Sequence, residues 1–160
     1  MKADATQGPL SDAEVRVFSE AVTRYFRHSG GDAAAVRAAF LHDGSALPPT
    51  DDYTGLIALS GAWRGCVYFS APTSMLRQLL ATMNERGGHD AYLDAVGEIA
   101  NTIAGNARRH FGESLEISVP VTAAGSIERI KIGVRARPLV LAVEWRGLAA
   151  LLVVDMERAA

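Results

Sequence analysis

The chain has 160 residues, of which 49 % are hydrophobic, and a formal net charge of −2. These values fit one globular domain with a sizeable core, and they lack the basic excess that is typical of proteins binding nucleic acid or anionic lipid. The single cysteine, Cys66, lies in an apolar run and cannot form an internal disulfide, which predicts a buried thiol in a reducing compartment.

Two further features concern the cellular location. No apolar run approaches the roughly 20 residues that are needed to cross a bilayer. The first residues also lack the basic-then-apolar pattern of a secretory signal. We therefore expect a cytoplasmic protein with no membrane segment and no nucleic-acid partner.

The first half of the chain predicts one long helix and one short strand. Residues 1–10 are polar and contain Gly and Pro, so we expect a flexible leader before a domain over residues 11–157. Ser11 and Glu14 have the spacing of a capping box. Apolar residues then recur at helical spacing up to the pair Gly30-Gly31: Val15, Phe18, Val22 and Phe26. Residues 36–41 predict a short strand, followed by a connecting loop over residues 42–51.

A hairpin and a shorter helix come next. Residues 53–60 and 65–70 predict two strands joined by a loop of four or five residues. Pro72 then opens a helix whose apolar residues lie on one face: Met75, Leu76, Leu79, Leu80 and Met83.

Residues 90–112 predict the second long helix, with Asp90 as N-cap and Gly112 as a left-handed C-cap. Its core face is a stripe of apolar residues: Leu93, Val96, Ala100, Ile103 and Ala107. Five other residues point in nearly the opposite direction, toward solvent: Asp94, Glu98, Asn101, Gly105 and Arg108.

Two glycines make this helix unusual. Gly97 and Gly105 each cost up to about 1 kcal/mol of helix stability relative to alanine. One explanation is that they let the backbone of another protein approach the exposed face. The other is that they allow close packing against another element of the same chain, with Glu98 and Asn101 as an ordinary solvated pair. Spacing alone favours the second explanation.

The last third of the chain predicts strands only. Ile117, Val119 and Val121 alternate as one strand, which Pro120 places at a sheet edge or a bulge. Residues 130–136 alternate strictly between apolar residues and a basic outer face, which we interpret as a solvated strand face. Residues 139–145 and 148–155 predict a buried hairpin around Arg146-Gly147.

The order of elements repeats. Residues 18–24 parallel residues 92–98, and Trp-Arg-Gly recurs at 63–65 and 145–147, each time in a hairpin turn. We therefore predict an α/β domain of the α+β type with pseudo-twofold symmetry, in which a largely antiparallel sheet packs against two long helices and one shorter helix. Arg24 and Arg27 stand where the second half has Glu98 and Asn101, so only the second half is expected to keep a site.

Several other kinds of site are disfavoured. The four histidines are scattered without metal-ligand spacing, so no metal site is expected. The sequence contains no phosphate-binding loop ending in Lys-Ser or Lys-Thr, and no Gly-x-Ser-x-Gly motif.

Residues 94–107 resemble the signature helix of CheX within the CheC/CheX/FliY family of chemotaxis phosphatases. The core of that signature is an acidic residue or serine, then glutamate four residues later and asparagine three after that, here Asp94, Glu98 and Asn101. Other segments resemble the family in the same order: Ala21-Val22 with Tyr25-Phe26, and residues 52–55, 59–61, 65–69 and 117–120.

The resemblance implies hydrolysis of an aspartyl phosphate on a CheY-like receiver domain, the phosphate-accepting domain of a response regulator. It implies that Asn101 orients the attacking water and that Glu98 pairs with a lysine of the receiver. Asp94 would dock the same surface, with Gly97, Gly105 and Arg108 as further partner contacts. The Mg²⁺ would come from the receiver, with no cofactor bound by this chain, and the protein would be a homodimer. Two alternatives remain open: a non-catalytic receiver-binding module, and a scaffold.

Overall fold

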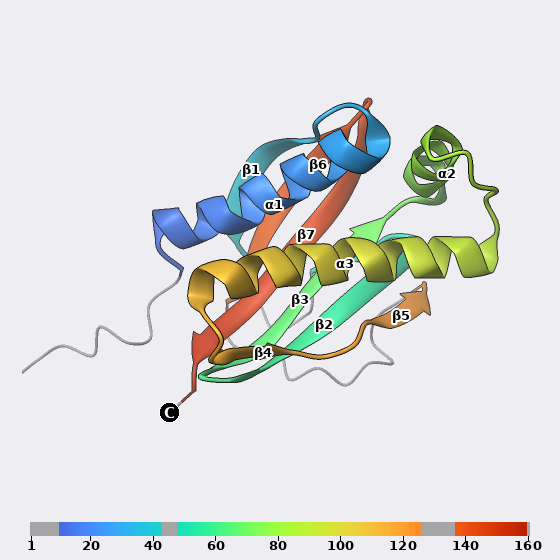
Figure 1. Cartoon of the computed structure of the whole chain (residues 1–160). Helices are drawn as coiled ribbons and strands as arrows, with labels where there is room; N and C mark the ends of the chain where they lie inside the picture. Colours follow the sequence, from blue (N-terminus) through green and yellow to red (C-terminus); the bar gives the residue numbers. More distant parts are fainter. Residues whose placement is uncertain (1–9, 43–47, 126–136, 160) are drawn as a thin grey trace, which may run out of the picture.

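The computed structural model describes residues 10–42, 48–125 and 137–159 (Figure 1). Most of the predicted leader and the predicted strand over residues 130–136 lie outside these ranges. The elements follow in this order: α1 (Asp12–Gly30), β1 (Ala35–Leu41), β2 (Tyr53–Gly61), β3 (Trp63–Ala71), α2 (Thr73–Thr82), α3 (His89–Phe111), β4 (Leu115–Ile117), β5 (Val121–Ala124), β6 (Leu139–Trp145) and β7 (Leu148–Arg158).

The described strands form one antiparallel sheet in the order β1-β6-β7-β3-β2-β4, with β5 also paired to β2. The hairpins β2-β3 and β6-β7 meet at the centre through β3 and β7. Strand β1 precedes the first hairpin but pairs with the second, whereas β4 and β5 precede the second hairpin but pair with the first. The two halves thus exchange their outer strands, β1 for β4 and β5, and the strand order has the symmetry that the sequence repeat predicts.

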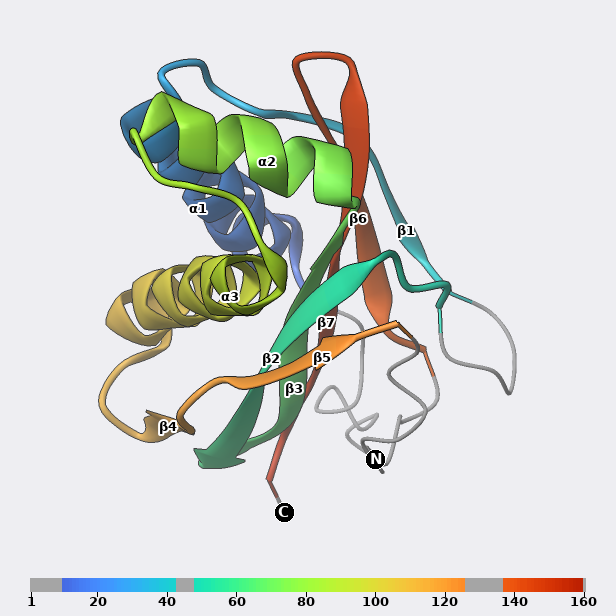
Figure 2. The same cartoon turned by 90° about the vertical axis from the view of Figure 1, so that its right-hand side faces the viewer.

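All three helices cover the same face of the sheet (Figure 2). Helices α1 and α3 run side by side across it, and α2 lies near one end (Figure 1). The core lies between the helices and the sheet. Its largest fully buried side chains include Phe18 and Phe26 of α1, Ile99 and Ile103 of α3 and Trp145 of β6. The expected α3 stripe is buried except Leu93, which is half-buried.

A glycine in β2 sets the distance between α3 and the sheet. A methyl group on Gly55 would overlap the backbone of Val96 and Gly97 in α3. Because Gly55 has no side chain, the helix backbone lies directly on the strand. This close contact fixes the distance between α3 and the sheet, and with it the position of the exposed face of α3.

The predicted cap of α1 is confirmed, and the predicted N-cap of α3 is wrong. Glu14 N donates to Ser11 Oγ over 3.2 Å, Ser11 N donates to Glu14 Oε1 over 2.9 Å, and Gly31 ends the helix. The N-cap of α3 is Gly88, two residues before the predicted Asp90, and the first helical residue is His89. Asp90 instead lies in the first turn, where the helix dipole favours a carboxylate.

The other end of α3 also differs from the prediction. Gly112 does end the helix, and its N–H donates to Arg108 O over 2.9 Å. Its φ of 96° is positive, but its ψ of 176° is extended rather than left-handed helical. The chain then turns at residues 113–114, where Leu115 N donates to Gly112 O over 3.1 Å, and enters β4.

The strand predicted through Ile117, Val119 and Val121 is two strands separated by a bulge. Leu59 pairs with Ile117 and Leu56 with Val121, so two residues of β2 lie opposite residues 118–120. Because of this one extra residue, the side chains that follow it point to the opposite face of the sheet from the one predicted. Val119 and Val121 are consequently 80 % and 44 % exposed instead of alternating into the core.

The two predicted hairpins are confirmed with small differences in length. Five residues separate the last β2-β3 pair, Leu59 and Gly65, as expected. Within this loop Ser60 and Gly61 still pair with β4, and Trp63 and Arg64 pair with β7. The second hairpin turns at Arg146-Gly147, and β7 continues to Arg158, three residues beyond the prediction.

None of the helices in the described ranges combines the length and hydropathy that a membrane crossing requires.

Candidate functional site on helix α3

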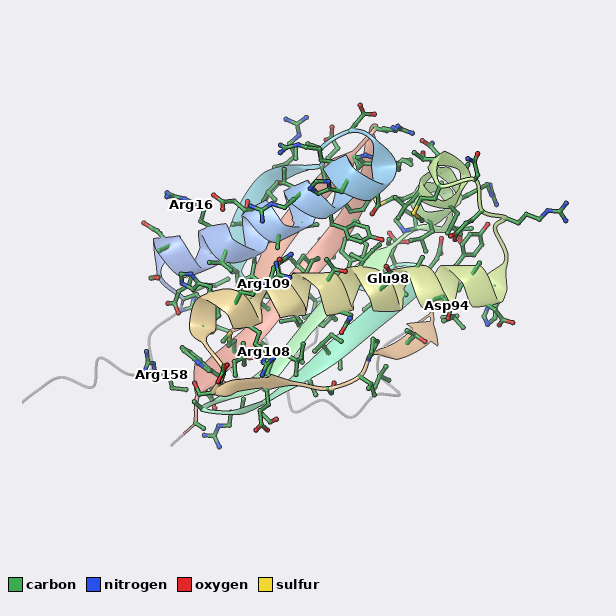
Figure 3. All side chains as sticks on the ribbon, in the orientation of Figure 1. Arg16, Asp94, Glu98, Arg108, Arg109 and Arg158 are labelled. Atoms are coloured by element: carbon green, nitrogen blue, oxygen red, sulfur yellow. The ribbon has the colours of Figure 1, made fainter. Side chains whose placement is uncertain are left out.

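The exposed face of α3 carries the polar residues that the sequence placed there. Asp94, Glu98 and Asn101 are exposed, because the apolar residues of the helix take the opposite face against the sheet. Figure 3 shows Asp94 and Glu98 along the N-terminal half of α3, and Arg108 nearer its C-terminal end beside β4. The signature residues therefore share one solvent-facing surface.

The three signature side chains also line one groove. Its volume is about 580 Å³, and its other lining residues are Gly97, Thr102, Pro120 and Thr122. Helix α3 forms one wall, and the bulge with the start of β5 forms the other. An open groove of this kind, with carboxylate and carboxamide groups on one side, suits a protruding part of another macromolecule.

The two glycines of α3 have different surroundings. Gly97 is buried, and a methyl group there would lie 3.0 Å from Thr122 Cγ2 and 3.4 Å from Pro120 Cβ. Gly105 is half-buried, and a methyl group there would meet nothing within 4 Å. Close packing within the chain therefore explains Gly97, whereas Gly105 leaves the helix surface open.

Arg108 is exposed but lies outside the groove. Its Nε donates to Leu115 O over 3.0 Å, a hydrogen bond that ties the end of α3 to β4. This contact gives Arg108 a structural role, beside the partner contact that the resemblance implies.

The polar groups of the groove are available to a ligand. Within the described ranges, the side chains of Asp94, Glu98 and Asn101 form no hydrogen bond and no ion pair. Burial raises the pKa of Tyr25 on α1 to about 12; a hydrogen bond with Ser29 opposes the rise, and the charges of Glu98 and Glu85 add to it. The Tyr25 phenol of α1 is therefore neutral at physiological pH, and the Glu98 charge favours this neutral form.

Three groove residues were not predicted from the sequence: Thr102, Pro120 and Thr122. Pro120 was a partial indication, because a proline in this strand predicted a sheet edge or a bulge. The pairing of this edge with β2, which brings it beside α3, depends on contacts that local sequence does not encode.

Helix α1 presents different chemistry at the corresponding positions. Arg24 and Arg27 are exposed, as the repeat predicts. Arg24 lines a separate groove of about 310 Å³ between α1 and α3, together with Arg109 and His110. This second groove has two arginines, one histidine and one carboxylate, Glu20, whereas the signature groove has two carboxylates and no basic side chain.

Cys66 is buried, as predicted, and no cluster of metal-binding side chains occurs in the part of the chain that the structure describes. Burial raises the pKa of the Cys66 thiol to about 12, and the nearby Asp155 carboxylate adds to the rise. A thiol of this kind is not a nucleophile at neutral pH.

Comparison with known families identifies the chain. The family model described as Chemotaxis phosphatase CheX matches residues 53–144, which is more than half of the sequence. This chain belongs to the CheX family. The matched range includes β2, α3 and β5, and therefore both walls of the signature groove. Comparison with curated proteins gives no significant match.

Solved structures of CheX proteins share the fold. The chemotaxis protein CheX from Vibrio vulnificus superposes with a TM-score of 0.77 at 20 % identity, covering 91 % of this chain and 99 % of that one. CheX from Desulfovibrio desulfuricans gives a TM-score of 0.76 at 14 % identity, with coverage of 91 % and 99 %. A CheX-CheY-BeF₃-Mg²⁺ complex from Borrelia burgdorferi gives 0.63 at 15 % identity, with coverage of 91 % and 98 %.

Proposed function

We propose that this CheX family member hydrolyses the aspartyl phosphate of a CheY-like receiver domain. The observation that carries the proposal is the shared groove, in which Glu98 and Asn101 are exposed and unpaired on one face of α3. The Borrelia burgdorferi relative was crystallised in complex with CheY. Because the substrate is a signalling domain of the cytoplasm, we also propose a cytoplasmic location.

Asn101 is proposed to orient the attacking water. Its carboxamide offers one acceptor and two donor hydrogens on a short side chain, so it can hold a water in line with the phosphorus while replacing solvent. An acyl phosphate is already labile, and phosphoryl transfer depends mainly on positioning and electrostatics. No covalent intermediate on this chain is needed.

Glu98 is proposed to fix the receiver over Asn101 by pairing with a lysine of the receiver active site. Glu98 lacks an ion-pair partner among the described residues. A pair between Glu98 and the receiver lysine would form a charge-assisted hydrogen bond, which is stronger than a neutral one. Asp94, one turn earlier, extends the same acidic surface. The Mg²⁺ that neutralises the phosphoryl oxygens is proposed to belong to the receiver.

Release of inorganic phosphate from phosphorylated receivers of the same organism, in the presence of Mg²⁺, tests the proposal. We expect Asn101→Ala to lower kcat at least about 100-fold with little change in receiver affinity. We expect Glu98→Ala to weaken both affinity and turnover. Asn106→Ala is a matched control, because Asn106 lies on the same helix outside the groove and should retain full activity.

Two outcomes contradict parts of this proposal. Unchanged phosphate release by Asn101→Ala contradicts the assigned role of Asn101. Detectable receiver binding without accelerated release by the wild-type chain indicates a non-catalytic binding module.

We also propose a homodimer, formed through the edge strand β1. Within the described residues β1 pairs only with β6, and Ala38, Ala39 and Phe40 on it are exposed. An exposed apolar edge strand is a template for pairing with a second chain. Sedimentation equilibrium of the purified protein tests this assembly.

A further inference from the structure

An exposed valine directly precedes a residue that lines the signature groove. Of the described residues, only Phe40, Val119 and Val121 are large hydrophobic side chains classed as exposed. Val119 is the most exposed of them, at 80 %, and it directly precedes Pro120 in the groove wall. Val121 pairs with Leu56, which belongs to the small cluster apart from the helices, and it is less exposed than Val119.

The position of Val119 is fixed by its neighbour. Ser118 N donates to Ala58 O over 3.0 Å, and Ala58 N donates to Ser118 Oγ over 2.8 Å. Ser118 Oγ in turn donates to Val119 O over 2.9 Å. The serine hydroxyl thus replaces a missing strand contact, and the bulge presents Val119 from a defined backbone.

The α3 wall of the groove lacks the apolar area that a protein interface needs at its centre. Its exposed residues Asp94, Glu98 and Asn101 are all polar. Stable interfaces combine polar contacts with an apolar, fully desolvated area. The bulge supplies such an area next to the acidic and amide groups.

We propose that Val119, together with the adjoining Pro120 wall, is an apolar docking contact for the phosphorylated receiver. This inference rests on the proposed function and adds a residue that sets affinity rather than chemistry. The receiver would place its lysine toward the acidic α3 wall and an apolar side chain against the bulge. The proposal thus requires a receiver domain whose docking surface has a basic side chain beside an apolar one.

Steady-state phosphate release with varied receiver concentration tests this proposal. Val119→Thr keeps the branched shape but replaces one methyl group with a hydroxyl group. We expect its KM for the receiver to rise at least about fourfold, the value of one buried methyl group, with kcat unchanged. Val119→Ile keeps an apolar side chain and should retain the wild-type KM. Since Val119 is exposed, both variants should fold, which thermal unfolding verifies.

Binding to a receiver loaded with beryllofluoride and Mg²⁺ gives a second readout that does not need turnover. The proposal predicts weaker binding by Val119→Thr and wild-type binding by Val119→Ile. Wild-type KM and binding in Val119→Thr would overturn it. A change in sedimentation of Val119→Thr that accounts for the loss would also overturn it, because the bulge would then contact a second copy. If Asn101→Ala retains full phosphate release, the assigned role of Asn101 fails, while the binding readout still tests Val119.

Discussion

Gly97 and Gly105 both lie in α3, and replacing each with alanine separates helix propensity from packing. An exposed glycine in a helix costs about 1 kcal/mol relative to alanine. At Gly105 a methyl group meets nothing within 4 Å, so Gly105→Ala should gain nearly this full amount. For a domain of this size the gain corresponds to a rise in Tm of about 2–4 °C.

Gly97→Ala should behave differently although the substitution is the same. The new methyl group would lie 3.0 Å from Thr122 Cγ2, about half an ångström closer than an optimal carbon contact. Overpacking of this kind costs about 1–3 kcal/mol, which offsets or exceeds the helix gain. Since β5 has only four residues and lies at the sheet edge, it should shift outward and open the groove.

Urea unfolding followed by circular dichroism measures both effects, and receiver binding measures their consequence. We expect Gly105→Ala to be more stable than Gly97→Ala by about 1–3 kcal/mol. We also expect Gly105→Ala to bind the receiver more weakly than the wild type, because its methyl group raises the docking surface. Equal stability of the two variants would refute the packing argument, and a Gly105→Ala variant no more stable than the wild type would refute the open-surface argument.

Two further predictions concern stability alone. Gly55→Ala should destabilise the fold by about 3 kcal/mol or more, since its methyl group overlaps the α3 backbone; a variant with wild-type urea midpoint would contradict the close approach of α3 to β2. Stability should be constant up to about pH 9 and then fall, because burial raises the pKa of Cys66 from 9.0 to about 12 and that of Tyr25 from 10.0 to about 12. Each such group favours its protonated form in the folded state and costs about 1.4 kcal/mol per pH unit between its two pKa values. Urea midpoints from pH 8 to 11 measure this, and Cys66→Ala should show a smaller loss.

Periodicity predicted the parts of the fold that depend on one element at a time. The stripe from Val96 to Ala107 placed Asp94, Glu98 and Asn101 on the exposed face, because a helix has a fixed angle between residues. The turn at Arg146-Gly147 was also predicted, from the two apolar runs on either side of it, and both residues adopt the positive φ of a tight hairpin. These features need no knowledge of distant contacts.

The features that the sequence did not predict depend on contacts between elements. The alternation of Ile117, Val119 and Val121 looks like one strand, but pairing with β2 inserts one extra residue and exposes both valines. The N-cap of α3 is Gly88 and not Asp90 as predicted, and the local sequence is compatible with either residue in that position. Thr122 joined the groove only because the sheet brings β5 beside Gly97.

The two halves of the chain differ at the same structural step, the strand that follows each long helix. Each long helix is followed by a strand with one extra residue, at Arg37 in β1 and within residues 118–120 between β4 and β5. Arg37 is paired with Glu144 over 3.1 Å, so the first bulge is closed by an ion pair within the chain. The second bulge contains Val119, which is 80 % exposed, and Pro120, which lines the signature groove. The signature groove therefore needs more than Glu98 and Asn101 on a helix, because Pro120 and Thr122 from the segment that follows form its second wall.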